Sequence, residues 1–176
     1  AYLSFEELST FPKTLRHLAG ALARGAGPKK LALLRSHAEH YADILRSARY
    51  NLRLLRARLD AGPLSSAPVE GGSWPAVPGG RWHRVNLGHA AFVIPVLDAP
   101  APAPRPWWRR AFTKAPDDAV TASVRKTVAA LEALTAEASA VERELRAEAA
   151  KSSPDARRLL ELSTRLVALA RDADRL

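Results

Sequence analysis

The amino-acid sequence predicts a mainly α-helical protein: an antiparallel coiled-coil or helical-bundle stalk with an inserted small β-hairpin and a Pro/Gly-rich head at one end. Two long stretches repeat apolar residues at alternating spacings of three and four, which is the seam pattern of coiled coils. Most of the 13 prolines lie between these stretches, where they prevent a continuous helix. We therefore expect a discontinuous helical stalk from residues 1–60 and 117–176, with residues 61–116 as the head.

Two short helices are expected before the first long one. Ser4 and Glu7 have the spacing of a capping box and predict a short opening helix. A second helix is predicted from Pro12 to Arg24, because proline suits the first helical turn and the following Gly25 can end a helix.

The first long helix is predicted from Pro28 to the stop at Gly62-Pro63. At about 1.5 Å per residue, its roughly 33 residues would form a rod of about 50 Å. Its expected seam consists of Leu31, Leu34, Ala38, Tyr41, Leu45, Ala48, Leu52, Leu55 and Leu59.

The last third of the chain repeats this pattern. A second long helix should start near Asp117 or Asp118, because carboxylates suit a helix N-terminus. The run Ser152-Ser153-Pro154-Asp155 predicts an N-cap and a first-turn proline for a last helix. The expected seams are Val120, Val124, Thr127, Leu131, Leu134, Ala138, Val141 and Leu145, then Leu159, Leu162, Leu166, Leu169, Ala173 and Leu176.

These seams must be covered. The simplest arrangement pairs the two long helices antiparallel, with the helices of residues 12–24 and 154–176 packed at their far end. Alternatively, the seams could be covered between two chains, which would make the protein a homodimer.

The head contains the strand-like sequence. Residues 81–87 and 91–97 flank Asn86-Leu-Gly88-His89, which can form a hairpin turn. Pro95 restricts the second strand to a sheet edge. A small apolar cluster is expected from Trp82, Phe92, Ile94 and Val96.

The charge is unevenly distributed. The chain has 27 Lys and Arg against 18 Asp and Glu, a net charge of +9. On the first long helix Arg46, Arg49, Arg53 and Arg56 form a row beside the seam, with Arg35 earlier on the same row. Such a row could contact nucleic-acid phosphates. The alternative is that these arginines form ion pairs across the seam. Their candidate partners are Glu132, Glu137, Glu142, Glu144 and Glu148.

All four tryptophans, Trp74, Trp82, Trp107 and Trp108, fall in the head. In the run Trp107-Trp108-Arg109-Arg110, aromatic faces stand beside guanidinium groups, which suits bases, phosphates, lipid headgroups or a protein interface. A structural alternative is that one tryptophan caps the end of the bundle.

Motifs for catalysis are not found. The chain has no Cys, which excludes disulfides, thiolate zinc sites and cysteine nucleophiles. It has no GxSxG elbow and no phosphate-binding glycine loop. His37 and His40 stand three apart, without the repeated Glu-x-x-His of a helical metal site. We expect no enzyme, no cofactor and no metal.

No stretch approaches the roughly 18 apolar residues of a membrane span, and with no basic-then-apolar leader we expect a cytoplasmic protein.

The function expected from these features is a non-catalytic assembly subunit that contacts nucleic-acid phosphates without sequence specificity. The alternative is a scaffold or adaptor that docks a protein partner through the head, and a third reading is attachment to a membrane surface. The expected phosphate contacts are Arg46, Arg49, Arg53, Arg56, Arg81, Arg84, Arg109 and Arg110. The expected partner contacts are Trp74, Trp82, Trp107 and Trp108.

Overall fold

The computed structural model describes residues 5–62, 65–71, 76, 78–86, 91–97 and 119–176. The predicted fold class is confirmed: the protein is mainly helical, its helices pack as a bundle, and a small antiparallel sheet lies between them in the sequence. The chain forms two compact units, residues 1–53 with 129–176 and residues 54–128, and both boundaries lie inside long helices. We describe each unit separately.

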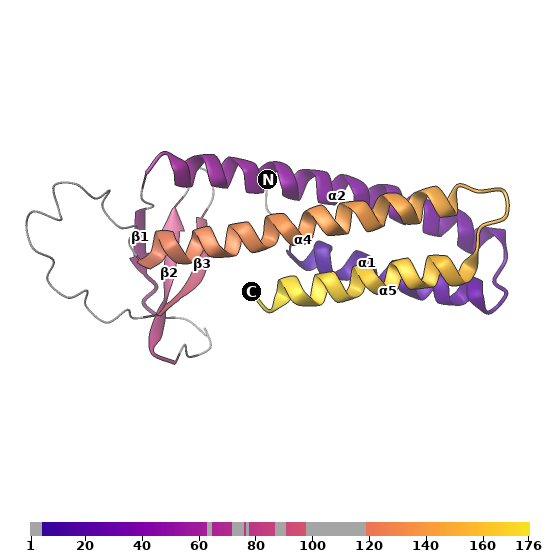
Figure 1. The fold of residues 1–176 in the computed structure, drawn as a ribbon. Helices are drawn as coiled ribbons and strands as arrows, with labels where there is room; N and C mark the ends of the chain where they lie inside the picture. Colours follow the sequence, from indigo (N-terminus) through magenta and orange to yellow (C-terminus); the bar gives the residue numbers. More distant parts are fainter. Residues whose placement is uncertain (1–4, 63–64, 72–75, 77, 87–90, 98–118) are drawn as a thin grey trace, which may run out of the picture. The chain divides into compact units, whose positions relative to one another are not determined.

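The first unit is a bundle of four helices (Figure 1). It contains α1 (Phe5–Ala23), most of α2 (Pro28–Asp60), most of α4 (Ala119–Ala149) and α5 (Ala156–Asp174). Short connections join α1 to α2 and α4 to α5, which makes each of these pairs antiparallel. The pair α2 and α4 is also antiparallel, because Arg35 near the start of α2 donates a hydrogen bond to the carbonyl of Ala149 at the end of α4.

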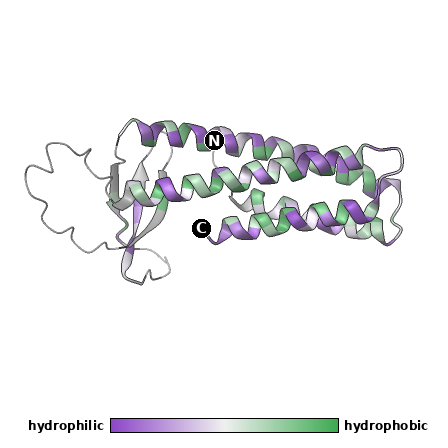
Figure 2. Cartoon of the chain, in the orientation of Figure 1, coloured by the Kyte–Doolittle hydropathy of each residue, from purple (hydrophilic) through white to green (hydrophobic). Residues whose placement is uncertain are grey.

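Each helix contributes one apolar face to the bundle, and apolar and polar residues alternate along the helices in Figure 2. The predicted seam of α2 is confirmed: its residues are buried, except Leu31 and Leu55, which are half-buried. Leu34, Tyr41 and Leu45 belong to one core cluster with residues of the other three helices. Within the first unit, the seam of α2 is thus covered by the same chain.

The start of the chain differs from the prediction. One helix, α1, runs from Phe5 to Ala23 with Pro12 inside it, where a break before a second helix was expected. Proline lacks the N–H that would bond the carbonyl of Leu8. The side chain of Pro12 is among the most fully buried in the protein, and this apolar burial offsets the missing hydrogen bond. The prediction treated Pro12 only as a helix signal, whereas it is also a core residue.

The seam of α4 is confirmed at one of its two heptad positions, where Val124, Leu131, Ala138 and Leu145 are buried. At the other position Val141 is buried as predicted, and the side chain of Val120 lies outside the described residues. Earlier along the helix the buried residue comes one place later than predicted. Val128 is buried where Thr127 was expected, and Thr135 is buried where Leu134 was expected. The buried row is Thr121, Val128, Thr135, Glu142 and Ala149, at intervals of seven. Three of its members are polar, which is why a search for apolar residues missed it.

The N-cap of α5 is Asp155, where a serine N-cap before Pro154 was expected. Its carboxylate accepts hydrogen bonds from the backbone N–H groups of Arg157 at 2.9 Å and Arg158 at 3.3 Å, which satisfies two of the free donors of the first turn. The seam of α5 is buried at Leu159, Leu162, Leu166 and Leu169. The predicted continuation to Leu176 is wrong, since that residue is exposed.

The second unit contains the ends of α2 and α4 and a three-stranded antiparallel sheet in the order β1-β2-β3. The strands are β1 (Ser65–Pro68), β2 (Gly80–Asn86) and β3 (Ala91–Leu97). The predicted hairpin of β2 and β3 is confirmed, and Pro95 lies in a strand at the sheet edge. The register pairs Trp82 with Pro95 and His83 with Ile94. The predicted apolar cluster of Trp82, Phe92, Ile94 and Val96 stays a prediction, because the side chains of its three β3 members lie outside the described ones.

The strand β1 was not predicted. It lies in a Ser- and Pro-containing stretch that has none of the alternating apolar residues of a typical strand. Its pairing with β2 aligns Ser65 with Asn86 and Pro68 with His83. This segment is therefore a strand because its backbone pairs with β2, and not because of its side-chain pattern.

Candidate anion-binding groove

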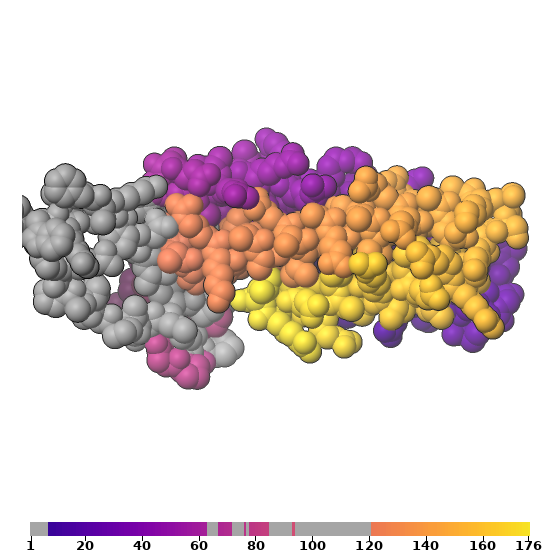
Figure 3. Space-filling model, in the orientation of Figure 1, coloured from indigo at the N-terminus to yellow at the C-terminus, as the bar shows by residue number. Residues whose placement is uncertain are grey.

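The candidate site is a groove between α2 and α4 in the first unit, with a volume of about 560 Å³. In the face drawn in Figure 3, α4 lies between α2 and α5. Residues of α2 line one wall because positions three and four apart share one face of a helix. The lining residues are Ala42, Leu45, Arg46, Arg49, Tyr50 and Arg53 from α2, with Ser139, Glu142, Arg143 and Arg146 from α4.

Five of these ten residues are arginines, and one is acidic. Two of the arginines have carboxylate partners: Arg46 pairs with Asp43 on its own helix at 2.8 Å, and Arg146 pairs with Glu142 one turn earlier on α4. Arg49, Arg53 and Arg143 form no ion pair within the described part of the chain, although the charge of Arg143 acts on the Glu142 carboxylate. Arg143 has only a long hydrogen bond, at 3.4 Å, from its Nε to the carbonyl of Ser139. The groove therefore has an excess of positive charge.

The predicted alternative, ion pairs between the α2 arginine row and the α4 glutamates, is wrong for four of these glutamates. Glu137 accepts a hydrogen bond from Arg165 of α5 at 2.7 Å, and Glu144 accepts one from Arg158 of α5 at 2.9 Å. Glu148 pairs with Lys151 in the following loop. Glu142 pairs with Arg146 of its own helix. The partners are the arginines Arg146, Arg158 and Arg165 and the lysine Lys151, so no ion pair with these glutamates neutralises the α2 row.

The single carboxylate of the groove lies at its floor. The side chain of Glu142 is 3% exposed, whereas that of Arg146 is 41% exposed. Burial raises the pKa of Glu142 above its ordinary value, and the hydrogen bond from Arg146 and the charges of Arg143 and Arg46 only partly oppose this. Burial also raises the pKa of the nearby Tyr41, and the charge of Glu142 adds to that shift. Burial of the ionised Glu142 carboxylate thus costs more free energy than its interactions with the arginines supply.

The groove continues along α4 into a second hollow of about 400 Å³, which Arg143 and Arg146 also line together with Arg35 and Glu39. In this hollow Arg35 donates two hydrogen bonds to backbone carbonyls. Its Nε donates to the carbonyl of Ala149 at 2.6 Å and its Nη2 to that of Lys151 at 3.2 Å. Arg35 therefore caps the C-terminus of α4, where carbonyl groups lack helical partners.

The other expected phosphate contacts are distributed differently. Arg56 belongs to the second unit, and Arg81 and Arg84 are exposed on β2. Arg109 and Arg110 lie outside the described residues. The structure therefore brings together Arg46, Arg49 and Arg53, and it adds Arg143, Arg146 and Tyr50, which the sequence analysis did not select. Arg143 and Arg146 follow Glu142 by one and four residues, so placing Glu142 in the buried row would have identified them.

Of the expected partner contacts, only Trp82 is described, and it is half-buried in β2. Trp74, Trp107 and Trp108 lie outside the described residues. Docking of a protein partner through the head therefore stays a prediction.

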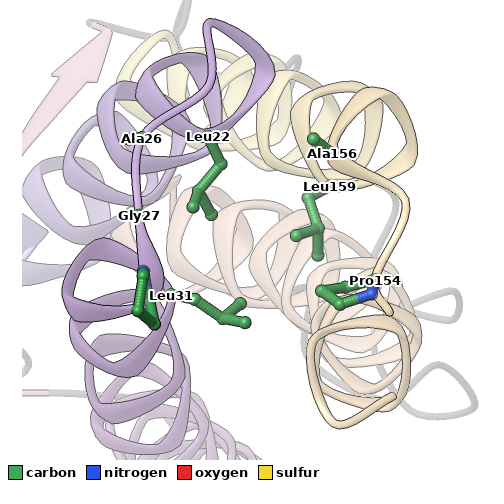
Figure 4. Close-up of a pocket in the computed structure, with 8 residues that line it drawn as sticks. Leu22, Ala26, Gly27, Leu31, Pro154, Ala156 and Leu159 are labelled. Atoms are coloured by element: carbon green, nitrogen blue, oxygen red, sulfur yellow. The ribbon is translucent and has the colours of Figure 1, made fainter. Parts of the chain in front are cut away.

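A separate apolar hollow of about 250 Å³ lies at the end of the bundle where the two short connections meet (Figure 4). Leu22, Leu31 and Leu159 face it from three helices, and Pro154 closes one side. Because its lining provides no charged side chain, it offers no group for catalysis or for recognition of an ion.

His37 and His40 both contact the ring of Phe11 of α1, with ring centroids 5.8 and 5.1 Å apart. In the described part of the chain, no three residues of the types His, Cys, Asp and Glu lie close enough together to hold a metal ion.

Among the described helices, none combines the length and apolar character needed to cross a membrane.

Comparison of the chain with protein-family models, curated proteins and solved structures finds no match. The functional argument consequently depends on the residues of the groove and on their chemistry.

Proposed function

We propose that the protein is a non-catalytic subunit of a larger assembly that contacts nucleic-acid phosphates without sequence specificity, and that the groove between α2 and α4 holds phosphates. The observation that carries this proposal is that Arg49, Arg53 and Arg143 line one groove and form no ion pair within the described residues. A guanidinium group donates a planar fork of hydrogen bonds that matches the oxygens of a phosphate.

The arrangement also fits a backbone contact. Arg46 and Arg53 are seven residues apart on α2, a distance of roughly 10 Å along the helix axis, so their guanidinium groups can meet more than one phosphate of a strand. Contacts to phosphates carry no sequence information. The net charge of +9 adds a long-range attraction to polyanions. Arg56, Arg81, Arg84, Arg109 and Arg110 are further proposed contacts outside the groove.

The test is a salt series of binding to fluorescently labelled, mixed-sequence RNA and DNA, measured by fluorescence anisotropy. Binding through three groove phosphates predicts that the slope of log K against log salt includes a contribution of about −2 for a single strand and about −3 for a duplex. The combined variant Arg49→Gln, Arg53→Gln, Arg143→Gln should lose this contribution and most of the affinity at about 50 mM salt.

A matched control removes the same number of charges elsewhere. Arg16, Arg157 and Arg171 are exposed arginines of α1 and α5 that do not line the groove. Their combined change to Gln should weaken binding far less than the groove variant. Equal losses in the two triple variants, or no binding at about 50 mM salt, would contradict the proposal.

A further inference from the structure

The most exposed large apolar side chain of the described residues lies in this groove. Tyr50 is 61% exposed, more than Leu33, Leu54 or Leu176, and it lines the groove. A large side chain left in water forgoes the stabilisation that burial would give it. Tyr50 therefore contributes little to the bundle core, and its aromatic face is open to a ligand.

Arginines neighbour Tyr50 on the surface of α2. Tyr50 follows Arg46 by four residues and precedes Arg53 by three, and residues at these spacings are neighbours on a helix surface. The half-buried Arg49 lies on the same wall of the groove. Aromatic faces interleaved with cationic groups are the combination used by proteins that bind single-stranded nucleic acids, where bases stack on the rings and phosphates meet the cations.

We propose that the groove binds single-stranded nucleic acid, with Tyr50 as the platform on which one base stacks while Arg49, Arg53 and Arg143 hold the adjoining phosphates. This inference rests on the proposed function and names its substrate class. A duplex keeps its base faces stacked inside, so it can use the arginines but not Tyr50. The positive charge of the groove favours a polyanion over an apolar protein surface as the occupant of this ring.

The test compares labelled 20-nucleotide single strands of RNA and DNA, a duplex of the same length, and a single strand with abasic sites in its central segment. For Tyr50→Ala we expect about tenfold weaker binding of the intact single strands, with duplex and abasic binding changed by less than about twofold. Tyr50→Phe should retain single-strand binding, because a phenyl ring also stacks. Leu33→Ala removes another exposed apolar residue of α2 and serves as the control, and circular dichroism verifies that each variant is folded.

Two results would overturn the inference, and they are distinguishable. If Tyr50→Ala leaves single-strand binding unchanged, or weakens single strands, duplex and abasic strand equally, Tyr50 is not a base platform, although the phosphate groove stands as long as the arginine variant still loses binding. If the unmodified protein binds none of the nucleic acids, the proposed function fails and this inference fails with it.

Discussion

The ion pair between the buried Glu142 and the partly exposed Arg146 allows a prediction in which its two partners behave differently. Changing Arg146 to Gln leaves the carboxylate of Glu142, 3% exposed, without the group that hydrogen-bonds it. Changing Glu142 to Gln instead leaves a guanidinium that is 41% exposed and can be hydrated. An uncompensated buried charge is costly, whereas an unpaired charge near the surface costs little.

The magnitudes follow from this asymmetry. Breaking a fully buried pair costs about 3–5 kcal/mol. Because Arg146 is partly exposed and Arg143 and Arg46 also stabilise the carboxylate, we expect Arg146→Gln to lower the free energy of unfolding by about 2 kcal/mol at pH 7. This corresponds to a fall in Tm of about 4–8 °C for a chain of this size. Glu142→Gln keeps the size and one acceptor oxygen while removing the desolvated charge, and should stabilise the protein by about 0–1 kcal/mol.

The pH dependence has a defined sign. Since the pKa of Glu142 is raised in the folded protein above the ordinary 4.5, this group's contribution to stability is fully present below pH 4.5 and is lost as the pH rises through the folded pKa. The difference between Arg146→Gln and the unmodified protein should therefore be largest at pH 7 and shrink as the pH falls toward 4.5, because the carboxyl becomes increasingly protonated. The gain from Glu142→Gln should diminish over the same range.

Urea unfolding followed by circular dichroism at pH 4.5 and pH 7 measures both effects. The exposed pair of Arg165 and Glu137, with side chains 58% and 46% exposed, is the control, and a change to Gln at either position should cost no more than about 0.5 kcal/mol. The reasoning is refuted if Glu142→Gln destabilises the protein as strongly as Arg146→Gln at pH 7, because the pair would then be net stabilising despite its burial.

Three further predictions concern the bundle itself. Arg35→Ala removes the hydrogen bonds to the carbonyls of Ala149 at the end of α4 and of Lys151 in the following loop. It should lower the free energy of unfolding in urea by about 1–2 kcal/mol, and an unchanged midpoint would show that the cap is dispensable. Asp155→Ala removes the N-cap of α5 and should cost about 1 kcal/mol in thermal unfolding, with Asp155→Asn largely restoring it. Leu145→Ala empties a position that is 0% exposed and should cost about 3 kcal/mol, whereas Leu33→Ala on the exposed side of α2 should change stability by less than about 0.5 kcal/mol.

Apolar periodicity predicted the helices well where their buried positions are apolar. The long helix α2 matches its predicted range from Pro28, and its seam is the buried face. Prediction was wrong where one residue type serves two purposes. Pro12 reads as a helix start but packs in the core, and Thr135 reads as a surface residue but is buried with its hydroxyl bonded to the carbonyl of Leu131.

Only the α2 wall of the groove was predictable from the sequence. The row of Arg46, Arg49 and Arg53 is visible in the sequence because it lies beside a regular seam. Its opposite wall depends on which residues of the antiparallel helix lie across from it, and this register is set by the buried row that contains Glu142. Since that row is partly polar, the prediction placed Thr127 and Leu134 in the seam where Val128 and Thr135 are buried. It also did not select Arg143 and Arg146.

The charge of a segment does not give the charge of each of its faces. Residues 117–176 carry 10 basic and 11 acidic residues, so this segment is nearly neutral, and its glutamates are candidate partners for the basic first half of the chain. In the folded bundle, Glu137 and Glu144 form their ion pairs with arginines of α5. These carboxylates thus lie on the side of α4 toward α5. On the side toward α2, the groove is lined by Arg143 and Arg146, and Glu142 is its one negatively charged lining residue. Two helices, one of them nearly neutral by composition, thereby form a groove with an excess of positive charge.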